Sequence, residues 1–172
     1  MRRFSHQVIY QLGLAVCLLI CTIMAFLNMY KLECPLTDGT TEHFNGKMVD
    51  YSRGYILLIV LALVIGVFAE FVYFNKWLII ASGVLVIGVG LRFMTFADSS
   101  RGQVKLADTK GIITSDLLGE VLDKLSGTPM AIKSQFTGEF TFAFYGYMIF
   151  AIGALAFAVM SAMFINKDSY SY

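Results

Sequence analysis

Charged residues are scarce in this 172-residue chain, at 15% against the roughly 25% that is usual in soluble domains. Hydrophobic residues make up 58% of the chain, and the mean hydropathy is +0.71. Disordered chains combine low hydrophobicity with high net charge, so this composition excludes disorder. It predicts an integral membrane protein.

An excess of either sign of charge is also missing, since 13 Lys and Arg residues face 12 Asp and Glu residues. Nucleic-acid binding needs a basic excess, so we exclude nucleic acid as a partner. Only three cysteines are present. Cys17 and Cys21 lie in an apolar run and Cys34 stands alone in a loop, so an ectodomain stapled by disulfides is not expected.

Four stretches are apolar over the roughly 20 residues that a membrane-spanning helix needs. Each contains at most one charged residue, Glu70 in the second stretch and Arg92 in the third. We therefore predict a single all-α domain over 1–172, an integral membrane four-helix bundle. The predicted spans are about 8–30, 55–74, 77–97 and 140–165, and the predicted outer loops are about 31–54 and 98–138.

The N-terminal segment predicts the orientation of the chain. Arg2 and Arg3 precede the first span, and positive charge at this place favours a cytoplasmic N-terminus. The first apolar stretch is longer than the core of a secretory signal and ends without small residues spaced for cleavage, so we expect a retained helix. An even number of spans then predicts a multi-pass protein with both termini in the cytoplasm.

The second outer loop contains a segment with the pattern of an amphipathic helix. In TSDLLGEVLDKLSG, from Thr114 to Gly127, apolar residues recur at helical spacing behind an acidic first turn. Such a helix either covers the spans or the membrane surface as a lid, or docks a partner. In the first loop, turn dipeptides make a two-stranded ribbon possible. The apolar residues of the predicted helix are Leu117, Leu118, Val121, Leu122 and Leu125.

Ionisable side chains are costly inside a bilayer, which makes each one a candidate functional residue. At 1.5 Å per residue, Glu70 and Arg92 lie roughly 16 Å apart along the bundle, too far for an ion pair. Gln11 lies at the depth of Glu70, and we expect a hydrogen bond between them. Alternatively, Glu70 reaches the inner headgroups or belongs to a proton or ion relay. For Arg92 we expect Glu139 or Asp98 as the partner.

Small residues recur along the second, third and fourth spans, where they would let helices approach closely. Such positions serve packing within the bundle or association with another membrane protein, and the pattern is compatible with both uses. These residues are Ala62, Gly66, Gly83, Gly88, Gly90, Gly146, Gly153, Ala154, Ala158 and Ala162.

Motifs that carry chemistry are missing from the sequence, including the P-loop, GxSxG, HExxH and Cys-x-x-Cys patterns. The two histidines, His6 and His43, lie in different segments and do not form the ligand set of a metal site. We therefore predict no cofactor, no metal and no enzymatic activity.

The layout of the chain resembles that of four-span membrane proteins. MRRF precedes the first span, FNKW makes a short turn between the second and third, and NKDSYSY is a polar tail. The basic lead-in and apolar spans are similar to those of MARVEL-type proteins, whose second loop is generally shorter. The Cys-Cys-Gly motif of tetraspanins and the tryptophan and cysteine pattern of claudin-like proteins are absent. The resemblance covers the whole chain, implies the four-span layout and transfers no site residues.

These observations favour a non-enzymatic accessory, scaffolding or membrane-organising subunit that associates laterally with other membrane proteins or with itself. One alternative is a small channel or transporter component in which Gln11, Glu70 and Arg92 line a wet path. Another is a lipid-acting enzyme at the interface, which needs acidic loop residues to converge on one pocket. The candidates for that role are Asp98, Asp108, Asp116, Glu120 and Glu139.

Overall fold

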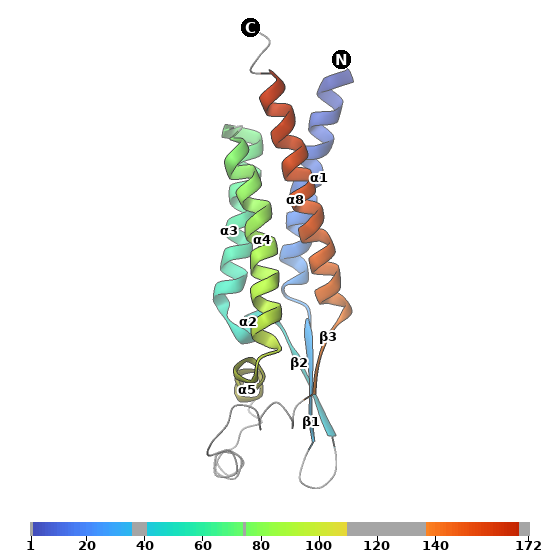
Figure 1. Ribbon diagram of the computed structural model, residues 1–172, viewed down its shortest axis with the longest axis vertical. Coiled ribbons are helices and arrows are strands. Elements are labelled where there is room, and N and C mark those ends of the chain that lie inside the picture. The colour runs from blue at the N-terminus through green and yellow to red at the C-terminus, as the bar shows by residue number, and fades with distance from the viewer. Residues whose placement is uncertain (1, 36–40, 74, 110–136, 169–172) are drawn as a thin grey trace.

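The computed structural model describes residues 2–35, 41–73, 75–109 and 137–168 (Figure 1). Four long helices dominate it: α1 (Arg2–Met24), α3 (Arg53–Phe68), α4 (Lys76–Ala97) and α8 (Phe142–Asp168). The chain of α3 continues without a break as a short π-helix, η1 (Ala69–Tyr73). Each long helix, with η1 counted as the continuation of α3, contains an apolar stretch sufficient to cross a membrane: Gln7–Met24, Arg53–Val72, Lys76–Ala97 and Phe142–Phe164. The predicted all-α bundle of a multi-pass membrane protein is confirmed.

The four helices form a closed ring in which α1 packs against α3 and α8, and α4 also packs against α3 and α8. Both termini lie at one end of the bundle, called the terminal end, and all strands lie at the opposite end, called the sheet end (Figure 1). The hairpin between α3 and α4 is short because Asn75 caps α4 at once. Its side-chain oxygen accepts hydrogen bonds from the main-chain nitrogens of Trp77 and Leu78.

The first span is shorter than predicted. The helix α1 ends at Met24, whereas we expected the span to continue to Tyr30. The intervening residues form a turn, and the main-chain nitrogen of Met29 donates to the carbonyl oxygen of Gly46 at 2.8 Å. Tyr30 then begins a strand with its side chain fully buried. The apolar run therefore continues past the helix because its last residues fill the core beneath a sheet.

Three antiparallel strands make up this sheet: β1 (Tyr30–Pro35), β2 (Thr41–Gly46) and β3 (Thr137–Phe140). Their order is β2-β1-β3, so the strand after the first span pairs with strands from both outer loops. The ribbon of the first loop was foreseen as a possibility, whereas β3 was not predicted. Alternation along β1 buries Tyr30 and Leu32 and leaves Lys31 and Glu33 on the other face.

Two further helices complete the sheet end: α2 (Met48–Tyr51) and α5 (Ser100–Thr109). The latter starts one turn beyond α4, where the hydroxyl oxygen of Ser99 accepts a hydrogen bond from the main-chain nitrogen of Gly102 at 3.1 Å. It buries Gln103 and Leu106 and exposes Arg101. We did not predict α5, and the amphipathic helix predicted around Leu117 to Leu125 lies outside the described residues.

Small residues bring the spans into close contact inside the bundle. A Cβ atom added to Gly83 of α4 would lie 2.8 Å from the Cα atom of Leu155 of α8, and one added to Gly66 of α3 would lie 2.7 Å from Leu18 Cδ1. Gly88 is the exception, because it is exposed and has nothing within 4 Å of an added Cβ atom. The other predicted small positions are buried or partly buried: Ala62, Gly66, Gly83, Gly90, Gly146, Gly153, Ala154, Ala158 and Ala162.

Candidate functional site

Three polar side chains meet inside the bundle near the terminal end. The side-chain nitrogen of Gln11, on α1, donates to the main-chain oxygen of Glu70 at 3.3 Å. The hydroxyl of Ser161, on α8, donates to Oε2 of Glu70 at 2.9 Å. Their exposed fractions are 7%, 1% and 0% for Gln11, Glu70 and Ser161. This intramembrane cluster links α1, η1 and α8 by polar contacts within the apolar layer.

The expected contact between Gln11 and Glu70 is therefore present, but its acceptor is the main chain of Glu70. The interpretation that Glu70 reaches the inner headgroups is wrong, because its side chain is buried by the bundle. Ser161 was missed. Its position three residues after Ala158 places it on the buried small-residue face of α8, and that spacing was the available signal.

Glu70 lies in the π-helical turn that ends α3. The wider turn alters the usual hydrogen-bond ladder: the main-chain nitrogen of Asn75 donates to the carbonyl oxygen of Ala69 at 3.2 Å, and the carbonyl oxygen of Glu70 accepts from Gln11. The Oε1 atom of Glu70 is buried with no hydrogen-bond partner. Single π-helical turns occur frequently at functional sites, and this one holds an acidic residue inside a membrane span.

Arg92 does not join this cluster. It lies on the exposed surface of α4, near the sheet end. Its expected partners, Asp98 and Glu139, are also exposed, and among the described residues neither forms an ion pair with it. Glu70 and Arg92 thus face different environments, the bundle interior and the outer surface.

The acidic residues of the second loop were candidates for a lipid-acting site. Asp98 and Glu139 are exposed, and the side chain of Asp108 is not among those described. Asp116 and Glu120 lie outside the described residues. Within the described part of the chain, no group of three metal-ligating side chains is found.

A buried aromatic cluster fixes the sheet to the bundle. The ring of Tyr30 packs edge-on against Phe140 at 5.1 Å between centroids, and that of Tyr51 packs edge-on against Phe93 at 5.2 Å. The side-chain nitrogen of Gln103 donates to the hydroxyl of Tyr30 at 3.2 Å. Burial raises the pKa values of the Tyr30 and Tyr51 hydroxyls. Both rings are therefore neutral packing groups, and they join the sheet to α2, α4 and α5.

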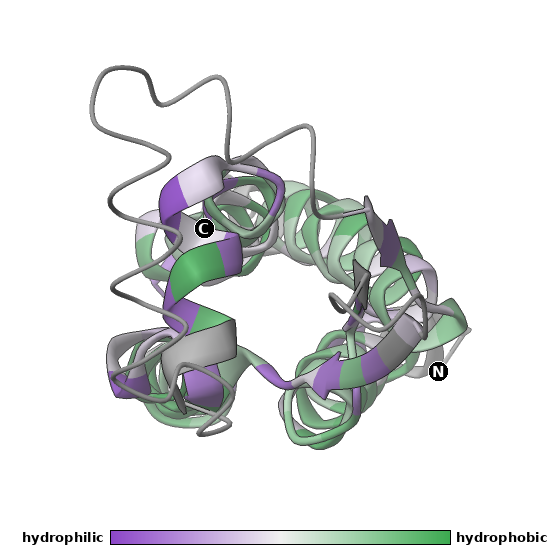
Figure 2. Cartoon of the chain, turned by 90° about the horizontal axis from the view of Figure 1, so that it is seen from below, coloured by the Kyte–Doolittle hydropathy of each residue, from purple (hydrophilic) through white to green (hydrophobic). Residues whose placement is uncertain are grey.

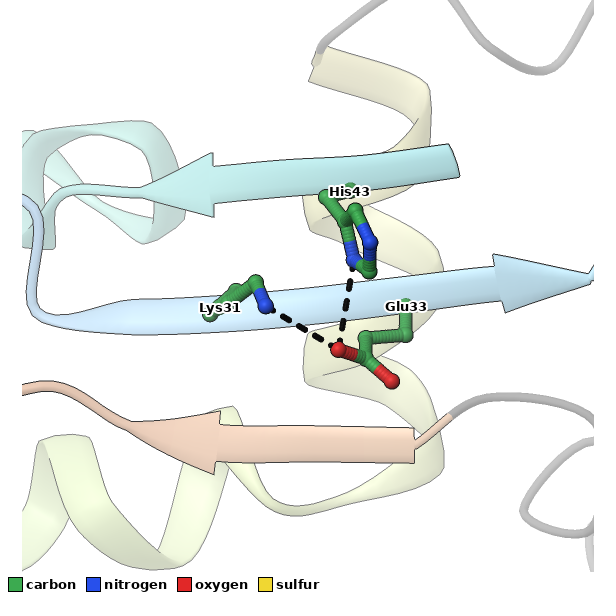
Figure 3. Close-up of polar contacts among 3 residues, drawn as sticks. All are labelled: Lys31, Glu33 and His43. Carbon is green, nitrogen blue, oxygen red and sulfur yellow. Dashed lines mark hydrogen bonds and ion pairs between the residues drawn. The ribbon is translucent and has the colours of Figure 1, made fainter. Parts of the chain in front are cut away.

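The opposite side of the sheet is polar. Oε1 of Glu33 lies 3.0 Å from Nζ of Lys31 and 3.2 Å from Nδ1 of His43, as Figure 3 shows. The hydrogen bond from Lys31, with the charges of Lys31 and His43, lowers the pKa of the Glu33 carboxyl. In register beside them lie Asn45, Thr137 and Glu139. The outer face of the sheet consists of Lys31, Glu33, His43, Asn45, Thr137 and Glu139.

The side chain of His43 is 52% exposed, and its neighbour across the strands is Glu33. The grouping of the outer face depends on the pairing of β3 with β1, which the sequence alone did not reveal.

No protein-family model and no curated protein matches this chain.

Proposed function

We propose that the protein is a non-enzymatic accessory or membrane-organising subunit that binds a partner protein through the outer face of its sheet. The observation that carries this proposal is the way the sheet is built. Strands from both outer loops pair there, and buried aromatic rings anchor them to the spans. The result is an anchored surface at the sheet end, beyond the ends of the long helices (Figure 1).

A surface of this kind is suited to recognition. Binding by a preorganised surface avoids much of the entropy cost of ordering loops. The outer face carries charges of both signs, with Lys31 beside Glu33 and Glu139 on the next strand. Mixed charges favour a partner whose charges are complementary and disfavour others. The face is therefore suited to specific recognition of such a partner.

The distribution of hydropathy divides the molecule into apolar spans and a polar sheet end. In Figure 2, seen from the sheet end, the long helices are mainly hydrophobic, and hydrophilic residues gather on the strands and α5. Most of the predicted small residues lie at contacts between the spans of this chain. Among these predicted residues, Gly88 is the one that lies on the exposed surface. Partner contact through the sheet thus has more support than lateral contact through the Gly and Ala positions.

The transporter alternative has less support. It needed Glu70 and Arg92 along one path, and these side chains face different environments.

With Arg2 and Arg3 favouring a cytoplasmic terminal end, the sheet would face the outside of the cell or the lumen of an organelle.

Site-directed photo-crosslinking in the native membrane tests the proposal. A photoreactive residue at Asn45 samples the outer face, and one at Ile149, which is 67% exposed on α8, samples the surroundings of the spans. We expect one stoichiometric protein adduct from Asn45 that is lost when Glu33 is changed to Lys. If Asn45 yields no protein adduct, or only the adducts that Ile149 yields, the proposal is wrong.

A further inference from the structure

Glu70 carries a buried oxygen atom that lacks a partner. Its Oε2 accepts the hydrogen bond from Ser161, whereas Oε1 is out of contact with solvent and has no hydrogen-bond partner. Buried polar atoms in folded proteins are nearly always paired, and an unpaired one needs a specific cause, such as an ion. The orphan oxygen lies inside a membrane span, where such groups are especially costly.

No positive charge balances this carboxylate among the residues whose side chains the structure describes. The groups that reach Glu70 are Gln11 from α1 and Ser161 from α8, and neither is charged. On α4, the hydroxyl of Ser82, which lies against Gly66 one helical turn before Glu70, donates to the carbonyl oxygen of Ile79 at 2.7 Å. An ionised carboxylate taken out of water without a partner costs several kcal/mol. The cluster is thus incomplete without a positive charge.

The chemistry of the cluster limits what that charge can be. A carboxylate, a hydroxyl and an amide all carry oxygen atoms, which are the ligands that hard cations prefer. One carboxylate balances a single positive charge. Because Glu70 is only 1% exposed, the basic side chain of a partner protein has no access to it. A small monovalent cation satisfies all three conditions.

We propose that Gln11, Glu70 and Ser161 form an intramembrane binding site for one monovalent cation, either a proton or a sodium ion. The π-helical turn contributes to this site because it presents the Glu70 main-chain oxygen to Gln11 and holds the carboxylate against Ser161. The site lies within the bundle, away from the outer face of the sheet, so it is independent of partner binding there.

Infrared difference spectroscopy tests the proposal on the purified full chain in detergent micelles. A protonated carboxyl group and a carboxylate absorb at separate frequencies, so no reagent has to reach the buried side chain. We expect a carboxyl band from Glu70 that is absent from the Glu70→Gln variant. If the occupant is a proton, the band of the protonated carboxyl in choline chloride falls as the pH rises and sodium has no effect. If the occupant is sodium, sodium chloride suppresses that band at constant pH and ionic strength.

Two serine variants make the test specific. Loss of a hydrogen bond or ligand to a charged group corresponds to about tenfold in binding, so Ser161→Ala should change the midpoint concentration of proton or sodium by about that factor. Ser82→Ala is the matched control, because that hydroxyl is bonded within its own helix. A Glu70 band that responds to neither pH nor sodium would overturn the proposal. An unchanged midpoint in Ser161→Ala would do the same.

Discussion

The two ends of the bundle are held together in different ways. At the sheet end, large rings such as Tyr30, Tyr51 and Phe93 are fully buried and pack edge to face. At the terminal end, contact depends on small residues such as Ala158 and on the polar contacts of Glu70. The same helices thus change from aromatic packing to close backbone approach along their length.

The difference follows from the two environments of the molecule, which are water at the sheet end and lipid around the spans. Side chains at the sheet end leave water when the protein folds, and burial there contributes about 25 cal/mol per Å² of apolar surface. Within a bilayer, lipid tails are as apolar as the helix surface, so close packing and hydrogen bonds drive association. Removal of bulk should therefore be costly at the sheet end, and addition of bulk should be costly between the spans.

The largest effect is expected from Tyr30→Ala. The ring of Tyr30 is fully buried and contacts Phe140 and Tyr51, so its loss should cost about 3–5 kcal/mol of unfolding free energy. Tyr145→Ala is the matched control, because Tyr145 is 56% exposed on α8. Unfolding of both variants by SDS in mixed micelles measures the difference. Equal loss of stability in the two variants would contradict the role given to the aromatic cluster.

A smaller loss of stability is expected from Gly83→Ala, which adds bulk between the spans instead of removing it. The added methyl group would meet the main chain of Leu155, which cannot move aside, so we expect a loss of about 1–3 kcal/mol. Gly88→Ala makes the same change in the same helix where space is open, and should gain up to about 1 kcal/mol from helix propensity. The same unfolding assay compares them. A stable Gly83→Ala variant would mean that α4 and α8 are not in close backbone contact.

The spans were predictable because an apolar run of about 20 residues rarely forms anything except a membrane-spanning helix. Of the sheet, only the ribbon of the first loop could be expected. Its strands are short and half polar, and Tyr30 also pairs with Phe140 from the far end of the chain. Tyr30 itself shows the difficulty. Hydropathy placed it at the end of a span, whereas strand pairing places it in the core. Hydropathy identifies which side chains leave water when the chain folds, but it does not identify the residues against which they pack.

The intramembrane cluster was predictable in part for a similar reason. Counting residues from the ends of the spans placed Gln11 and Glu70 at one depth, and they are in contact. Ser161 escaped notice because a small polar residue among alanines does not stand out in composition. The outward position of Gly88 was also hidden, since Gly83, Gly88 and Gly90 lie on more than one side of α4.

Two buried tyrosine hydroxyls provide a further comparison, with expected changes of about 1 kcal/mol in the unfolding free energy. The hydroxyl of Tyr147, between the spans, donates to the carbonyl oxygen of Val86 at 2.8 Å, whereas that of Tyr51 has no partner among the described groups. Tyr147→Phe should lose about 0.6–1 kcal/mol of unfolding free energy. Tyr51→Phe should be neutral or gain up to about 1 kcal/mol, because it removes an unpaired polar group. A larger loss in Tyr51→Phe than in Tyr147→Phe would contradict this assignment.

The smallest effect is expected on the outer face of the sheet, where water screens charges. The hydrogen bond from Lys31 lowers the pKa of Glu33 in the folded protein. A carboxyl whose pKa is lower when folded stabilises the protein above its unfolded pKa of about 4.3, and the contribution is lost as the pH falls through the folded value. Stability measured through this range should therefore fall less steeply in Glu33→Gln than in the parent. Glu139→Gln is the control, since Glu139 lies beside Lys31 in register and forms no ion pair within the described part of the chain. An acid dependence that is unchanged in Glu33→Gln, or reduced equally in both variants, would show that the contact between Lys31 and Glu33 adds nothing to the stability of the sheet end.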